Sequence, residues 1–138
     1  MMASYQYKYS ITHTRNKAFP EARFVYYPLI QVGLIGNNKG IKTIALIDTG
    51  AQYCFFDNSY ASALKIDYKD TPYKCDLSGI GGKMPENTAY FHDLKLVIYK
   101  PTSLFGLSQK AWEIDTKIGF LEKSTQYSAI LGEYGFFD

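Results

Sequence analysis

The sequence predicts an all-β domain with one or two short helices, and three observations support this prediction. Tyr and Phe, which favour strands, are abundant: the 138 residues include 13 Tyr and 9 Phe. Several short stretches alternate apolar and polar residues, which is the period of a half-buried strand. Segments containing Gly, Pro and Asn separate these stretches at short intervals. A chain of this length suffices for one domain, 1–138, with a genuine core but not for two.

The N-terminal third is expected to contribute an edge strand and a hairpin. Apolar and polar residues alternate over Tyr5–Ile11, which predicts a half-buried strand. Arg23–Ile35 is a second strand candidate, in which Pro28 bends the strand or marks a sheet edge. A Gly-Asn-Asn-Lys-Gly turn sequence separates it from a third candidate, Ile41–Ile47. We therefore expect the second and third candidates to pair.

The remainder of the chain is expected to supply further strands and the helices. Asn58–Leu64 is the best short helix, with Asn58 or Asp57 as its N-cap. Glu133–Phe137 is expected to begin a second helix. The other short apolar or alternating segments are Tyr53–Phe56, Tyr73–Leu77, Ala89–Tyr99, Trp112–Leu121 and Ser128–Gly132.

Composition and charge exclude several classes of function. Hydrophobic residues make up 46% of the chain, which excludes disorder over most of its length. The net charge is +2 and the charges are interspersed, so neither nucleic acid nor a membrane is expected as a partner. No stretch approaches the roughly 20 apolar residues of a membrane helix, and the N-terminal residues lack the apolar core of a secretory signal. The sequence alone does not decide whether Cys54 and Cys75 form a disulfide. We expect both to be reduced packing residues in a cytoplasmic protein.

The most informative segment is the apolar run Ile44–Ile47 followed by Asp48, Thr49, Gly50 and Ala51. Such a run predicts a buried strand, and a carboxylate at its end is costly to bury unless hydrogen bonds compensate it. Thr49 can donate one, and Gly50 lets the backbone turn tightly past the acid. The sequence therefore predicts a shielded, hydrogen-bonded carboxylate that is suited to acid–base chemistry.

Two further motifs follow this one in a fixed order: Gly79-Ile80-Gly81-Gly82 and Ile130-Leu131-Gly132. Over residues 23–138 the order resembles that of the retropepsin-like aspartic proteases, the one-domain relatives of pepsin. The closing segment 132–138 resembles the cellular, notably prokaryotic, members. The resemblance implies a closed, β-barrel-like acid-protease fold and an aspartic endopeptidase that acts on a peptide or protein substrate. It implies no metal and no cofactor.

The resemblance also implies a role for nine residues. Asp48 would be the acid–base residue of the catalytic Asp48-Thr49-Gly50 motif, and Thr49 would bond across a dimer axis. The other six residues would contact the substrate, the last four as the mobile tip of a flap: Ala51, Gln52, Gly79, Ile80, Gly81 and Gly82. For Tyr53, Phe55 and Phe56, a pocket and the core are equally open.

A homodimer is implied because the chain carries one Asp-Thr-Gly motif. Asp115-Thr116-Lys117 lacks the glycine and is not a second copy. Catalysis of the pepsin type needs two carboxylates that share a water and one proton, so Asp48 of each subunit would meet on a two-fold axis. The chain continues for six residues beyond Gly132. The interleaved C-terminal strand of the retroviral members is therefore not expected, and Tyr5–Ile11 is the candidate to replace it.

Two departures from the family pattern keep an alternative open. Gln52 stands where the viral enzymes carry Asp, and Glu133 stands where many members place Arg, so the ion pair between these positions cannot form. The alternative is a catalytically weak or inactive module of the same fold that binds peptides or dimerises. A third hypothesis is an inactive fragment that lacks its interface.

Overall fold

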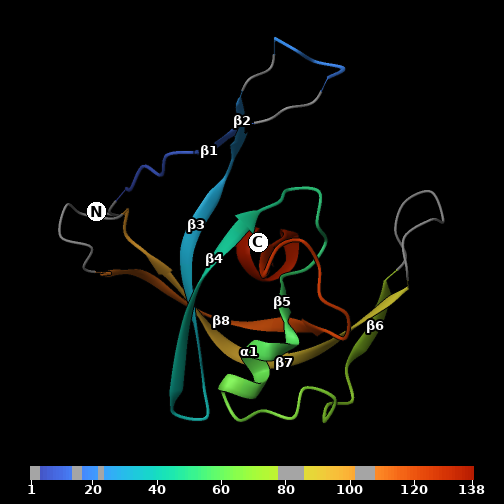
Figure 1. Ribbon diagram of the computed structural model, residues 1–138. Coiled ribbons are helices and arrows are strands. Elements are labelled where there is room, and N and C mark those ends of the chain that lie inside the picture. The colour runs from blue at the N-terminus through green and yellow to red at the C-terminus, as the bar shows by residue number, and fades with distance from the viewer. Residues whose placement is uncertain (1–3, 14–16, 22–23, 78–85, 102–107) are drawn as a thin grey trace.

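The computed structural model of the chain describes residues 4–13, 17–21, 24–77, 86–101 and 108–138. Strands dominate these residues, and the predicted all-β class is confirmed (Figure 1). In chain order the elements are β1 (Ser10–His13), β2 (Phe24–Tyr27), β3 (Leu29–Gly36), β4 (Lys39–Ile47), β5 (Phe55–Asp57), α1 (Asn58–Ala63), β6 (Lys74–Leu77), β7 (Asn87–Tyr99), β8 (Lys110–Leu121), β9 (Ala129–Leu131) and η1 (Glu133–Phe137). In this part of the chain, no helix has the length and apolar character needed to cross a bilayer.

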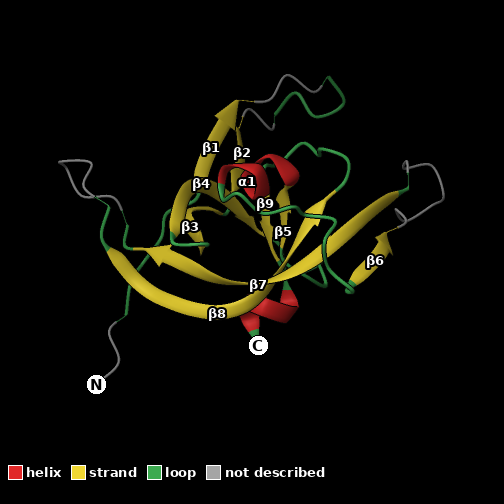
Figure 2. Cartoon of the chain, turned by 90° about the horizontal axis from the view of Figure 1, so that it is seen from below, coloured by secondary structure: helices red, strands yellow, loops and turns green. Residues whose placement is uncertain are grey.

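The sheet closes into a barrel, as expected. Its strands follow the order β3-β4-β9-β5-β8-β7, and β7 pairs back with β3 to complete the ring (Figures 1 and 2). β6 extends the sheet beyond β7. Closure pairs the edges of the ring with each other, so the backbone groups of the barrel strands are satisfied within the sheet.

The core fills the barrel from all sides. The fully buried side chains come from every part of the ring and from α1, and each contributes roughly 1.5–3 kcal/mol by burial. Among them are Val32, Leu34, Phe56, Leu64, Leu96, Phe120 and Leu131. Cys54 and Cys75 are free thiols, of which Cys54 is buried in this core.

The β3–β4 hairpin forms where the sequence predicts it. Asn37 and Asn38 both have positive φ, 50° and 58°, which is the backbone of a two-residue turn that matches the twist of the strands. The Asn37 amide also donates to the carbonyl oxygens of Leu64 and Lys65, at 3.3 and 3.2 Å. The turn is therefore tied to the end of α1.

Pro28 divides the predicted strand Arg23–Ile35 into β2 and β3, because proline has no N–H for the ladder. β2 pairs with β1 in a separate two-stranded ribbon that projects from the barrel (Figure 1).

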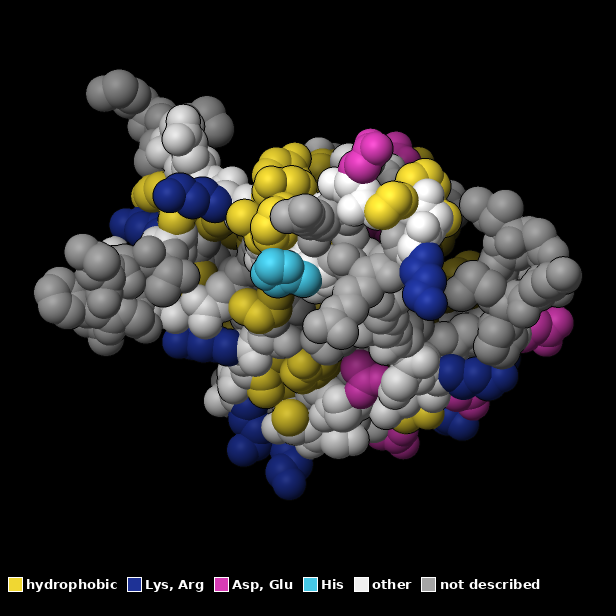
Figure 3. Space-filling model, turned by 45° about the horizontal axis from the view of Figure 1, so that its top comes forward, with side chains coloured by type: hydrophobic (Ala, Val, Ile, Leu, Met, Phe, Trp, Pro, Cys, Tyr) yellow, Lys and Arg dark blue, Asp and Glu magenta, His cyan; other side chains and the backbone are white. Residues whose placement is uncertain are grey.

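The surface view with the top of the molecule turned forward shows hydrophobic side chains that gather beside a histidine side chain (Figure 3).

The N-terminal strand begins later than predicted. We expected Tyr5–Ile11, but β1 starts at Ser10. The Tyr7 hydroxyl donates to the Tyr99 carbonyl oxygen at 2.6 Å, and the rings of Tyr5 and Trp112 meet edge to face at 5.3 Å. These side-chain contacts hold residues 5–9 across the barrel in place of strand pairing.

β9 threads between β4 and β5. It runs parallel to β4, with Leu46 opposite Ile130 and Ile47 opposite Leu131, and antiparallel to β5. Parallel pairing cannot be made by a tight turn and requires a long crossover, which the chain supplies through β5–β8. This pairing places Ile130 and Leu131 beside the end of β4, directly before Asp48.

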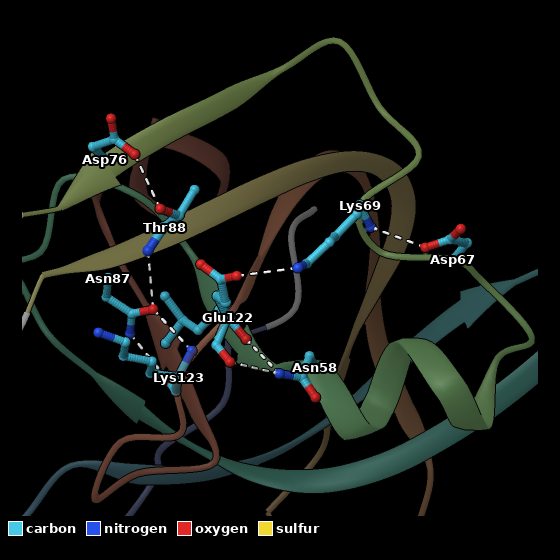
Figure 4. Close-up of polar contacts among 9 residues, drawn as sticks. Asn58, Asp67, Lys69, Asp76, Asn87, Thr88, Glu122 and Lys123 are labelled. Atoms are coloured by element: carbon cyan, nitrogen blue, oxygen red, sulfur yellow. Dashed lines mark hydrogen bonds and ion pairs between the residues drawn. The ribbon is translucent and has the colours of Figure 1, made fainter.

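Polar contacts fix α1 to the end of β8 and fix β6 to β7 (Figure 4). The Asn58 amide donates to the carbonyl oxygens of Leu121 and Glu122, at 2.9 and 3.0 Å. Thr88 on β7 donates to the Asp76 carboxylate on β6 at 3.0 Å. The hairpin arms β6 and β7 are thereby held in register from Lys74 to Leu77.

The last segment is not the regular helix that we expected. η1 is closed by a hydrogen bond from the Asp138 N–H to the Glu133 carbonyl oxygen at 3.2 Å, but Tyr134 and Gly135 have non-helical dihedrals. Gly135 has φ of 105°, a conformation that favours glycine. Tyr134 pairs with Tyr53 in an isolated parallel bridge, and the extended backbone that this pairing needs interrupts the helix.

Candidate active site

Asp48 lies directly after β4, at the point where β9 runs alongside. Its N–H donates to the Leu131 carbonyl oxygen at 2.9 Å, which anchors it to β9. The Asp48 carboxylate is half-buried and accepts a hydrogen bond from the Gly50 N–H at 2.9 Å. The Ala51 N–H donates to the Asp48 carbonyl oxygen at 3.1 Å. The hydrogen bond from the Gly50 N–H to the side chain of Asp48, two residues earlier, forms an Asx turn, and this turn fixes the orientation of the carboxylate.

The donor to Asp48 is the backbone of Gly50 and not the Thr49 hydroxyl that the sequence suggested. A Cβ on Gly50 would come within 3.2 Å of the Asp48 carboxylate, so glycine gives its N–H an unobstructed approach. Thr49 and Gly50 are exposed at the tip of this loop. The loop therefore presents Thr49 outward beside a carboxylate of fixed orientation.

The second half of the loop is clamped by the segment that follows β9. The Glu133 N–H donates to the Ala51 carbonyl oxygen and the Tyr134 N–H to the Gln52 carbonyl oxygen, both at 2.9 Å. Gly132 sits so close that a Cβ there would lie 2.7 Å from the Ala51 carbonyl oxygen. Only glycine fits this approach. Ala51 is half-buried and the Gln52 side chain is exposed.

Cys54 lies beneath this clamp. The Gly132 N–H donates to its sulfur at 3.4 Å, and burial raises the pKa of the Cys54 thiol. A thiol that stays protonated is a poor nucleophile. Cys54 therefore supports the loop by packing and takes no part in chemistry.

Tyr127 lies near enough to Asp48 for their charges to interact, and Tyr27 packs against Tyr127; sequence reasoning missed both tyrosines. Their rings are 6.3 Å apart. Burial raises the pKa of the Tyr127 phenol, and its neighbours Tyr27 and Asp48 act in the same direction. Tyr127 directly precedes the predicted strand Ser128–Gly132, which contains one of the three motifs, and this position is the signal that the sequence offers.

The predicted flap residues Gly79, Ile80, Gly81 and Gly82 lie outside the described residues. The strands on either side of them are described. β6 and β7 are antiparallel, and Leu77 faces Asn87 at the end of their ladder. The flanking strands thus have the pairing of a hairpin.

A pocket of about 620 Å³ opens between β6, β7, β8 and η1. Aromatic rings form much of its wall, with Tyr53 lying 5.3 Å from Phe91 and 5.9 Å from Tyr134. Tyr53 thus lines a pocket, while Phe56 is fully buried in the core and Phe55 packs half-buried against Phe91. Because Tyr53 follows Gln52 in the chain, the pocket adjoins the clamped loop.

The described residues hold no group of three or more His, Cys, Asp or Glu side chains close enough to bind one metal ion. Both histidines lie apart from Asp48 in the fold. His13 contacts Phe24 on the ribbon, and His92 Nε2 lies 2.8 Å from the Tyr68 carbonyl oxygen.

Comparison with known proteins agrees with this geometry. A family model described as aspartyl protease matches residues 32–120, a range that includes the Asp48 loop. No curated protein sequence matches the chain.

Two solved structures are similar to the chain at low identity. A retropepsin-like aspartic protease from Rickettsia conorii is 19% identical, with a TM-score of 0.46, over 88% of this chain and 79% of that one. The retroviral protease-like domain of Ddi1 from Leishmania major is 14% identical, with a TM-score of 0.35, over 75% of this chain and 71% of that one.

Proposed function

This chain belongs to the aspartyl protease family, and on that premise we propose that it is an aspartic endopeptidase which works as a homodimer. Two Asp48 carboxylates, one from each copy, would face each other across a two-fold axis with a water between them. Two like charges at such close range cannot both be ionised, so the pair would hold one shared proton. The two apparent pKa values would then belong to the pair.

The chemistry of the pair follows from its protonation. The ionised Asp48 takes a proton from the water while the water oxygen attacks the scissile carbonyl carbon. The other Asp48 donates its proton to the carbonyl oxygen. The tetrahedral intermediate then collapses. The first carboxyl gives its proton to the leaving nitrogen, and the second recovers one from a hydroxyl of the intermediate. The C–N bond breaks, and the pair returns to its starting state.

The observation that carries this proposal is the geometry of the Asp48 carboxylate. Within the described residues it accepts one hydrogen bond, from Gly50, and an ionised carboxylate can accept several. It therefore retains acceptor capacity for a water. The loop that holds it is fixed at both ends, by Leu131 and by the residues after Gly132, which is the pre-organisation that acid–base catalysis needs.

The substrate would lie along the clamped loop. Ala51 and Gln52 use their carbonyl oxygens within the fold, so the exposed Gln52 side chain is the group we assign to hydrogen-bonding a peptide. The neighbouring aromatic pocket around Tyr53 and Phe91 suits an apolar side chain. The flap role of Gly79–Gly82, a single domain over 1–138 and a cytoplasmic location stay predictions.

The test is cleavage of an unstructured protein between about pH 4 and 7, the range that a carboxylate pair sharing a proton suggests. Wild-type protein is expected to cut, and Asp48→Asn is expected to lose activity because its amide cannot act as a general base. Asp115→Asn is the matched control, since Asp115 also precedes Thr but lies exposed on β8. Cleavage that survives in Asp48→Asn would reject the proposal.

A peptide-binding module without turnover is the second candidate. Gln52 and Glu133 are both exposed and carry no ion pair between them, so the polar network expected of the viral enzymes is absent here. Wild-type protein that binds a peptide by calorimetry, and cuts none at any pH, would favour this candidate.

A further inference from the structure

The β1–β2 ribbon carries one face that is apolar and uncovered. Ile11 lies opposite Tyr26, and His13 lies opposite Phe24. Directly opposed residues in a ladder point to the same side of the sheet, so these four share a face. Ile11 and Tyr26 are each 60% exposed, Phe24 is 46% exposed, and Tyr9, just before β1, is 63% exposed. We call these five residues, Tyr9 included, the ribbon face.

The opposite side of the ribbon is less exposed, apart from Thr12. Ser10, Val25 and Tyr27 are half-buried there, and Tyr27 packs on Tyr127. A two-stranded ribbon is marginally stable by itself. An apolar face of this kind on the outer side is the mark of an interaction site rather than of ordinary surface.

The ribbon leaves the barrel beside the Asp48 loop. Its root is Pro28, whose carbonyl oxygen accepts the Ile47 N–H at 2.9 Å, one residue before Asp48. Figure 1 shows the ribbon rising beyond the end of the barrel at which β4 finishes. The root of the ribbon therefore lies next to the loop that carries the carboxylate.

The chemistry of the ribbon face selects the occupant. None of its five residues is Lys, Arg, Asp or Glu, so it carries no permanent charge for the phosphates of a nucleic acid or for an ionic partner. A two-fold interface places a surface patch against the same patch of the second copy. Two identical charged patches repel each other, whereas two identical apolar patches do not.

The surface area that a dimer would bury at the ribbon face is close to that of a specific interface. At about 200 Å² for each large side chain, covering the exposed part of Tyr9, Ile11, Phe24 and Tyr26 in two copies removes roughly 900 Å² of surface. Specific interfaces begin near 1,000 Å², and the exposed Thr49–Gly50 loops add to the total.

We propose that the ribbon face is the dimerisation surface of this protein, and that a second copy of the chain covers it and brings the two Asp48 carboxylates together. The inference rests on the proposed homodimer, because one chain supplies a single Asp48 to a site that needs two. It extends the Tyr5–Ile11 candidate that the sequence suggested: Tyr9 and Ile11 belong to both, and the ribbon adds His13, Phe24 and Tyr26.

Sedimentation equilibrium tests the interface. Wild-type protein is expected at twice the 15.7 kDa chain mass. Ile11→Lys with Tyr26→Lys places two cations on the ribbon face and is expected to weaken dimerisation roughly 100-fold or more. Thr12→Lys is the matched control, because Thr12 is exposed on the same strand but lies on the other side of it; it should stay dimeric. Ile11→Ser with Tyr26→Ser adds no charge and should give a smaller loss in the same direction, and circular dichroism checks that each variant is folded.

The outcomes separate this inference from the proposed activity. If the Lys pair, or the Ser pair where the Lys pair does not fold, remains as dimeric as wild type while the enzyme cuts peptides, the ribbon face is not the interface and the activity stands. If the expected mass shifts occur without any cleavage, the interface stands and the activity falls. Wild-type protein that sediments at the mass of one chain overturns the inference. If this monomer also co-sediments with phospholipid vesicles, a membrane surface and not a second copy covers the ribbon face.

Discussion

Gly132 is the residue on which the shape of the Asp48 loop depends most directly. Its backbone lies against the carbonyl groups of Ala51 and Tyr53, in the space that any Cβ would need. The loop and the strand that clamps it are both fixed by backbone hydrogen bonds, so neither can retreat cheaply. A side chain here displaces the backbone that orients Asp48.

We expect Gly132→Ala to lower the free energy of unfolding by about 2 kcal/mol or more, as overpacking does in a tight interior, and to abolish peptide cleavage. Gly40→Ala is the control, because a Cβ there would have neighbours no nearer than 3.8 Å and is expected to change stability by less than about 0.5 kcal/mol. Urea unfolding measures both. Equal stability of the two variants would contradict the steric account.

Asp57 gives the protein a stability that depends on pH. It caps α1 by accepting the Ser59 N–H at 3.1 Å, and Ser124 donates to it at 2.6 Å. Burial acts to raise the pKa of Asp57, but the hydrogen bonds from Ser124 and Ser59 outweigh it and leave the pKa below its ordinary value. A lowered pKa in the folded state contributes stability above the unfolded pKa of about 3.9, and this is lost as the pH falls through the folded value.

We therefore expect Asp57→Ala to cost about 1 kcal/mol near neutral pH, as the loss of a cap does, and the difference from wild type to shrink below about pH 4. Asp57→Asn is the control, because Asn also caps helices but does not titrate. Urea unfolding of the three proteins at pH 7 and pH 3 makes the comparison. A difference between wild type and Asp57→Ala that stays constant with pH would contradict the role of the carboxylate.

At the scale of single elements, the β3–β4 hairpin depends on two left-handed residues. Asn38 has φ of 58°, which costs most residues about 1–2 kcal/mol but suits Asn and Gly. Asn38→Ala is expected to lower the free energy of unfolding by about 1 kcal/mol, and Asn38→Gly to leave it unchanged or raise it. Thermal unfolding measures both. Asn38→Ala as stable as wild type would show that the turn tolerates another backbone conformation.

Elements were predictable where their signals are local. The turn at Asn37–Asn38 and the helix α1 depend on neighbours within a few residues, and Asp57 was one of the two cap candidates. The break at Pro28 was not predicted, because the sequence left a bend or a sheet edge open there. β1 was predicted to begin at Tyr5 but begins at Ser10, because Tyr7 binds the carbonyl of Tyr99, 92 residues away. The alternating pattern of residues 5–11 does not indicate that partner. η1 departs from a regular helix for a similar reason, since Tyr134 forms a bridge with Tyr53, which is distant in the sequence.

At the scale of the whole molecule, a site shared between two copies makes activity depend on concentration. If each chain contributes one Asp48, dilution below the dissociation constant of the dimer removes active sites by mass action. The rate per chain is expected to fall with dilution and to recover on reconcentration. Initial rates across a dilution series measure this dependence, and a constant rate per chain would indicate a site complete within one copy.

The sequence by itself determined the strand-rich class, the positions of most elements and the family to which the chain belongs. These depend on residue type, on period and on the order of short motifs such as Asp48-Thr49-Gly50, all of which are legible along the chain. The roles of the nine site residues stay predictions of the same kind.

Only the tertiary structure decided which distant residues meet. It placed Gly132 against Ala51, brought Tyr127 near Asp48 with Tyr27 packed on it, and left Ile11 and Tyr26 of the ribbon face uncovered. Each of these depends on the register in which β9, β4 and the ribbon strands pair, and a shift of one residue turns every side chain to the other face. Register is set by the packing of the closed barrel as a whole, which no single segment encodes.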